Sequence, residues 1–175
     1  MTCIIGIEHG GKVYMGGDSA GTIGWTSRPL SIPKVFKKQN MLIGVSGTMR
    51  ETQLLQYELS LPHKEADSPF IYLITAFVPA VRELFRVHGY LTTEDSQEIG
   101  ATFLVGYQGE IYLIDSGFGI CSYEDGVGVL GSGGDFALGA LYATRGMEPE
   151  KRIEIALNAA CFAGNVMPPF IIESI

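Results

Sequence analysis

The fold is decided near the start of the chain by residues 2–22, which read TCIIGIEHGGKVYMGGDSAGT. The isoleucine-rich run after Thr2 predicts a strand, the His-Gly-Gly-Lys segment at 9–12 predicts a turn, and residues 13–17 predict a second strand. The chain therefore begins with a β-hairpin that ends at Asp18. Because the second strand runs back along the first, we expect Asp18 to return to the side of Thr2.

Beyond the hairpin, groups of strand signals alternate with groups of helix signals. Residues 19–33 are rich in Gly, Ser and Pro and predict a loop, and the polar residues 91–98 predict another. The predicted groups are, in order, strands over 35–45, two helices over 48–89, strands over 101–115, two helices over 135–162 and a strand over 170–175. This order predicts an α+β fold in which two antiparallel sheets lie face to face, with a helix pair on each outer side.

Length and composition limit the function classes that the chain can serve. Its 175 residues fit one domain over 1–175. Only 18% of the residues are charged and 46% are hydrophobic, which indicates buried subunit interfaces. The net charge of −7 without a basic face argues against a general nucleic-acid binder. We see no secretory leader and no apolar run near the roughly 20 residues that cross a bilayer, so we expect no membrane partner.

The cysteines and histidines do not form a recognisable metal or disulfide pattern. Cys3, Cys121 and Cys161 are odd in number and widely spaced, which predicts neither a disulfide framework nor a zinc site. A reducing cytoplasm is the simplest setting for such a set, so we expect a cytoplasmic protein. The glycine run at 131–134 has no lysine for a phosphate loop. We therefore expect no metal ion and no cofactor.

Thr2 stands directly behind Met1. Removal of Met1, which is common before a small residue, would give Thr2 a hydroxyl and a free α-amine. Such an amine has a pKa of about 7.7–8.0 and could take the proton that a threonine hydroxyl must lose to become a nucleophile. Lys34 would favour the alkoxide and Asp18 would hold that cation. On spacing alone, a turn-forming aspartate and a surface lysine are the commoner interpretation. Because Thr2 and not Cys3 would be exposed, we interpret Cys3 as a core residue.

Three segments together resemble the start of proteasome β subunits and of the bacterial HslV-type peptidase. They are residues 2–7 (Thr-Cys-Ile-Ile-Gly-Ile), 16–22 (Gly-Gly-Asp-Ser-Ala-Gly-Thr) and 34–35 (Lys-Val). In that family an aspartate and a lysine follow the mature N-terminal threonine by 16 and 32 residues, and Asp18 and Lys34 stand at these separations from Thr2. The resemblance extends over nearly the whole chain. It implies the four-layer αββα sandwich of N-terminal nucleophile hydrolases.

The resemblance also implies residues that would assist catalysis. Residues 43–47 (Ile-Gly-Val-Ser-Gly) resemble the strand end that supplies the oxyanion-hole amide. We place this amide on Gly44, with Gly47 as the other candidate. Residues 130–134 resemble the segment whose serine lies near the catalytic amine, which makes Ser132 a site residue.

Four residues are expected to contact the substrate. Thr22 matches the family position whose backbone pairs with an extended peptide, a mode of binding that is largely indifferent to side chains. We expect Gly21 beside it to bind substrate as well. Ile32 and Phe36 flank Lys34, and we expect them to line an apolar specificity pocket. Peptides with an acidic residue before the cleaved bond should then be the poorest substrates.

The resemblance implies a threonine-type endopeptidase that hydrolyses peptide bonds of polypeptide substrates through an acyl-enzyme on Thr2. Such subunits form homo-oligomeric rings, hexameric or heptameric and in some cases double. The chain carries no ATPase motif, so an ATPase unfoldase would be a separate partner. Two alternatives stay open: an amidase or acylase of the same superfamily that acts on small amides, and an inactive proteasome-like scaffold subunit. The scaffold requires that Thr2 stay blocked.

Overall fold

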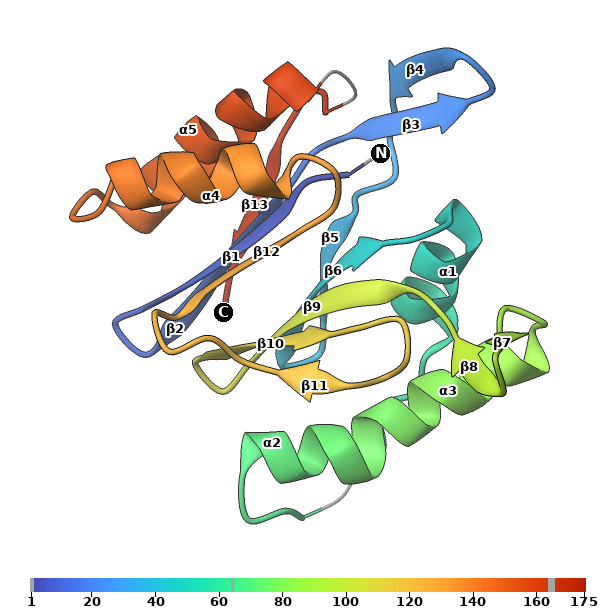
Figure 1. Ribbon diagram of the computed structural model, residues 1–175. Helices are drawn as coiled ribbons and strands as arrows, with labels where there is room; N and C mark the ends of the chain where they lie inside the picture. Colours follow the sequence, from blue (N-terminus) through green and yellow to red (C-terminus); the bar gives the residue numbers. More distant parts are fainter. Residues whose placement is uncertain (1, 64, 164–165) are drawn as a thin grey trace.

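Two β-sheets lie face to face, and helices cover both outer sides (Figure 1). The structure is a computed structural model that describes residues 2–63, 65–163 and 166–175. Met1, whose removal the sequence predicts, lies outside these residues. The four layers confirm the predicted αββα sandwich.

The first sheet joins the two ends of the chain. Its strand order is β12 (Val127–Leu130), β1 (Ile4–His9), β2 (Lys12–Gly17) and β13 (Ile171–Ser174). The second sheet has the order β11 (Ile120–Cys121), β10 (Glu110–Ile114), β9 (Thr102–Tyr107), β6 (Met41–Ser46) and β5 (Val35–Lys38). All neighbouring strands are antiparallel, so the predicted hairpin of β1 and β2 is confirmed.

The helices form the two outer layers. The second sheet is covered by α1 (Met49–Gln53), the π-helical turn η1 (Leu54–Glu58), α2 (Pro69–Tyr72), the π-helical turn η2 (Leu73–Phe77) and α3 (Val78–Val87). The first sheet is covered by α4 (Gly134–Ala143) and α5 (Pro149–Ala160), followed by the 3₁₀ turn η3 (Cys161–Ala163). Within the described ranges, no helix is both long and apolar enough to span a membrane.

Successive side chains of β1 pack into different layers of the sandwich. Ile4 belongs to the apolar cluster between the two sheets. Ile5 and Ile7 belong to the cluster under α4 and α5. This alternation follows from the two-residue period of a strand. Full burial of one such side chain contributes about 1.5–3 kcal/mol, so the register of β1, which sets the position of Thr2, is strongly fixed.

Both predicted loops contain short hairpins. Residues 19–33 form β3 (Ala20–Ile23) and β4 (Thr26–Pro29), and residues 91–98 lie largely in β7 (Thr92–Glu94) and β8 (Gln97–Ile99). The β3–β4 hairpin projects beyond the sheets (Figure 1). Its turn at Gly24 has a φ of 58°, a conformation that favours glycine. The loop predictions were wrong because turn-forming residues hid short strands whose partners lie only a few residues away.

Candidate active site

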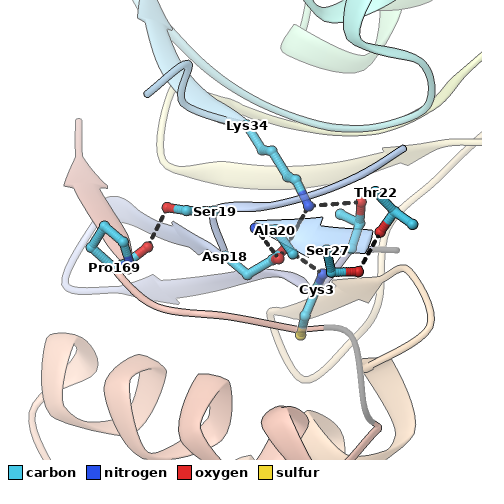
Figure 2. A network of polar contacts seen from close by, with 9 residues as sticks. Cys3, Asp18, Ser19, Ala20, Thr22, Ser27, Lys34 and Pro169 are labelled. Atoms are coloured by element: carbon cyan, nitrogen blue, oxygen red, sulfur yellow. Dashed lines mark hydrogen bonds and ion pairs between the residues drawn. The ribbon is translucent and has the colours of Figure 1, made fainter. Parts of the chain in front are cut away.

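The structure brings Thr2, Asp18 and Lys34 together. Thr2 lies just before β1 and Asp18 just after β2, and the antiparallel register places these two ends side by side. Lys34 precedes β5, and its Nζ donates to Thr2 Oγ1 at 3.2 Å. The same Nζ lies 2.9 and 3.1 Å from the two carboxylate oxygens of Asp18, and Figure 2 shows the lysine side chain pointing at the aspartate.

Asp18 is held from several sides. Its side chain is 0% exposed. Oδ1 also accepts the Cys3 N–H at 2.9 Å and Oδ2 accepts the Ala20 N–H at 2.8 Å (Figure 2). A buried carboxylate whose two oxygens both accept backbone donors cannot turn without losing hydrogen bonds. Asp18 therefore holds the Lys34 ammonium at Thr2.

Burial has opposite effects on Lys34 and Cys3, two titratable neighbours of Asp18. It lowers the pKa of Lys34 below its ordinary 10.5, while the negative charge and hydrogen bonds of Asp18 raise it in part. Burial, with a smaller contribution from the Asp18 charge, raises the pKa of Cys3 to about 12. Cys3 is 0% exposed, and its thiol stays neutral near pH 7. This agrees with its interpretation as a core residue and not a nucleophile.

The turn at 131–134 lies against Thr2. Gly131 has a φ of 91°, and a Cβ at this position would be 2.1 Å from the Thr2 carbonyl oxygen. The Gly133 N–H donates to the same oxygen at 3.3 Å. Ser132, between the two glycines, is exposed. Only glycine at 131 allows this approach, and Ser132 lies on the turn between the two glycines that contact Thr2.

A cleft opens at Thr2 and Lys34. Its walls come from the β3–β4 hairpin, the segment before β5, the end of β6 and the start of α1. The lining residues are Thr2, Ala20, Gly21, Thr22, Leu30, Ile32, Pro33, Lys34, Val45, Gly47, Thr48, Met49 and Thr52. The predicted substrate residues Gly21, Thr22 and Ile32 are among them. Among the described residues, no group of His, Cys, Asp or Glu side chains is arranged to hold a metal ion.

Gly44 and Phe36 lie away from this cleft, which corrects the predicted site. A Cβ on Gly44 would be 2.5 Å from Ile4 Cγ2 and 2.9 Å from Met15 Sδ, so Gly44 faces the core between the sheets. Gly47, the other candidate, follows β6 and lines the cleft. Phe36 is 4% exposed and packs under the helices of the second sheet. It points there because successive residues of β5 face opposite sides.

The start of α1 was missed as part of the site. Thr48 and Glu51 form a capping box, and Met49 and Thr52 line the cleft together with Thr48. The helix start was visible in the sequence. Its place opposite Thr2 was not, because the two segments meet only when the sheets pack together.

Comparisons with known proteins agree with the sandwich fold. No family model matches the chain. It is 25% identical over 170 residues to the ATP-dependent protease subunit HslV of Enterococcus faecalis, covering 94% of this chain and 88% of the relative. The solved structure of Thiobacillus denitrificans BPH in complex with epoxomicin matches with a TM-score of 0.84 at 17% identity, covering 99% of this chain and 98% of that one. A eukaryotic HslV from Trypanosoma brucei matches with a TM-score of 0.71 at 23% identity, covering 99% and 98%.

Proposed function

Because this chain is a member of the proteasome β/HslV-like family of N-terminal nucleophile hydrolases, we propose that it is a threonine-type endopeptidase with Thr2 as nucleophile. The observation that carries the proposal is the Lys34 ammonium, 3.2 Å from Thr2 Oγ1 and held by a fully buried Asp18. An ammonium at this place favours the alkoxide of Thr2. A surface lysine and a turn aspartate would not share one buried contact.

The reaction begins once Met1 is removed. The free α-amine of Thr2 takes the hydroxyl proton, directly or through one water, and Oγ1 attacks the peptide carbonyl. The carbon–nitrogen bond then breaks, the departing amine receives that proton, and an ester to Thr2 remains. Water hydrolyses the ester with the same α-amine as base. We propose that Ser132, on the turn whose glycines contact Thr2, hydrogen-bonds near that amine.

The opposite wall supplies the oxyanion donor. We assign this role to the Gly47 amide, because Gly47 follows β6 and lines the cleft with Thr2, whereas Gly44 lies within β6 and is paired with β5 on one side and β9 on the other. Fixed backbone donors at this position act where negative charge develops in the transition state.

The cleft fits an extended peptide better than a small amide. Among the described residues, β3 is hydrogen-bonded as a strand only to β4, so its other edge is open for strand addition by a substrate at Gly21 and Thr22. The apolar side chains of Ile32, Val45 and Met49 line the same cleft. We propose that an apolar substrate residue before the cleaved bond binds against them.

The family forms oligomeric rings, and we propose a homo-oligomeric ring for this chain, with any ATPase unfoldase as a separate protein. Three large apolar side chains that are exposed in the single chain support an assembly. Ile23 is 81% exposed, Phe162 is 85% exposed and Trp25 is fully exposed. Exposed apolar groups of this size are usually covered in oligomers. Ile23 and Trp25 lie on the projecting β3–β4 hairpin (Figure 1).

The test is the Thr2→Ala variant, assayed with fluorogenic peptides beside a panel of small amides. We expect hydrolysis to be abolished while the ring assembles as in the wild type. The mass of the N-terminal peptide should show loss of Met1 in the active wild type. Thr93→Ala, on the exposed strand β7, is the matched control and should leave activity unchanged.

Three outcomes would contradict the proposal. Hydrolysis by Thr2→Ala, or by a protein that keeps Met1, would exclude the amine mechanism. A wild type that cleaves small amides and not peptides would favour the amidase. A ring that keeps Met1 and cleaves neither would favour the scaffold subunit.

A further inference from the structure

A buried carboxylate holds the turn that follows β6. Glu51 is 7% exposed, and its Oε2 accepts the Thr48 N–H at 2.6 Å. In return, Thr48 Oγ1 accepts the Glu51 N–H at 3.2 Å. Hydrogen bonds to a charged acceptor are shorter and roughly twice as strong as neutral ones. The first of these contacts is therefore the stronger half of the capping box.

The same carboxylate lies against Gly47. A Cβ on Gly47 would be 2.8 Å from Glu51 Oε2 and 2.9 Å from the Ala101 Cβ. A side chain at position 47 would therefore collide with both Glu51 and Ala101, while the other side of Gly47 stays exposed at the cleft. Because a peptide unit is planar, fixing the Thr48 N–H fixes the Gly47–Thr48 peptide plane. The Gly47 N–H belongs to the preceding plane and is oriented through the backbone torsions of Gly47, at the point where Glu51 Oε2 lies against the turn.

The carboxylate of Glu51 is directed at this turn and not at a neighbouring cation. Arg50 pairs with Glu58 instead, at 2.9 Å. Among the described residues, no lysine, arginine or histidine forms an ion pair with Glu51. The helix start thus serves to hold the turn beside the cleft, in addition to beginning α1.

We propose that Glu51 is a positioning residue that fixes the turn at 47–48, so that the Gly47 amide faces the carbonyl of a peptide bound at Thr2. The inference rests on the proposed function, in which this amide stabilises the oxyanion. A donor that is already oriented does not have to reorganise as charge develops. A loosened turn would bind substrate as before but stabilise the tetrahedral intermediate less. The loss then falls on kcat and leaves KM unchanged.

The test compares Glu51→Asp and Glu51→Gln with the wild type. Aspartate keeps the charge at the helix start but is one methylene too short to reach the Thr48 N–H. Glutamine keeps the length and an acceptor oxygen, and should rescue most of the activity. We expect kcat to decrease in the order wild type, Glu51→Gln, Glu51→Asp, with a loss of about tenfold or more for the last, while KM stays constant.

A peptide aldehyde gives a second readout that a purely structural role would not change. The aldehyde forms a tetrahedral adduct on Thr2, and this adduct needs the oxyanion donor. A peptide that is bound but not attacked does not need the donor. The affinity of the aldehyde should weaken in proportion to the loss of kcat/KM across the variants. If Glu51→Asp does not fold, Glu51→Gln provides the test, because its aldehyde affinity should still weaken in proportion to its loss of kcat/KM.

Ser68→Ala is the matched control for loss of a cap. Ser68 Oγ accepts the Ile71 N–H at 3.3 Å at the start of α2, and Ser68 does not line the cleft of Thr2. Its removal should leave kcat unchanged. If Glu51→Asp matches Ser68→Ala, or raises KM and spares kcat, the positioning role is overturned. A wild type without Thr2-dependent hydrolysis overturns the proposed function itself, which separates the two failures.

Discussion

The two walls of the cleft are built in opposite ways. One wall carries Thr2, Asp18 and Lys34 at the ends of sheet strands, and the Asp18 side chain is fully buried. The other wall follows β6, where Gly47 is exposed and Met49 is 40% exposed. Strand ladders and buried hydrogen bonds fix the charged groups, whereas an exposed turn and a helix start form the other wall. The comparison teaches that the two walls of this cleft rest on parts with different freedom to vary.

Asp18→Asn tests the wall that carries Thr2, Asp18 and Lys34, and should have the largest effect on activity. The amide keeps the shape but replaces an acceptor with a donor facing Lys34 or a backbone N–H. We expect kcat to fall about 10²–10³-fold, because the ammonium loses its orientation at Thr2. Breaking a buried ion pair from one side also costs about 3–5 kcal/mol of unfolding free energy. Peptide hydrolysis and urea unfolding measure the two losses.

Glu83→Gln is the control for this variant. Glu83 pairs with Arg86 at 2.6 Å, but their side chains are 58% and 59% exposed. An exposed pair is screened by water and salt, so neither activity nor unfolding should change measurably. If both variants behaved alike, burial would not be what gives Asp18 its importance.

Met49→Lys tests the wall that follows β6, and should have an intermediate effect on substrate preference. The wild type should prefer leucine or phenylalanine over glutamate before the cleaved bond, since Ile32, Val45 and Met49 line the cleft. A lysine at 49 should move the ratio of kcat/KM values toward glutamate by about tenfold. Peptides that differ only at this residue give the measurement.

Met147→Lys is its matched control, because Met147 is 50% exposed and does not line the cleft. It should leave the preference as in the wild type. A wild type that cleaves best after glutamate would exclude the apolar pocket altogether.

The pH profile should show the smallest effect. The protonated form of Lys34 stabilises the alkoxide, and burial disfavours this form and lowers its pKa below 10.5. Activity should therefore decline with rising pH before 10.5 is reached. On the acid side, activity should rise as the α-amine becomes neutral, near about 7.7–8.0 for an ordinary amine. Measurements of kcat/KM against pH should give a bell-shaped curve, and an alkaline limb at or above the ordinary lysine pKa would contradict the role of burial.

The sequence predicted the wall that carries Thr2, Asp18 and Lys34 better than the wall that follows β6. Thr2 and Asp18 are joined by one hairpin, whose register can be inferred from alternating side chains and a Gly-Gly turn. Gly47 could not be chosen over Gly44 in this way. The two glycines lie three residues apart on one segment, and only the packing of Ile4 and Met15 against Gly44 assigns one to the core and the other to the cleft.

The sequence by itself determined the sandwich, the opening hairpin and the likeness of Thr2, Asp18 and Lys34 to a known catalytic set, because these follow from local periodicity and spacing. Tertiary structure alone decided that Lys34 reaches Thr2, that Phe36 turns into the core, and that the capping box of Glu51 lies beside the cleft. Such contacts join segments from different sheets. Their distances depend on how the apolar faces pack, which no local pattern specifies.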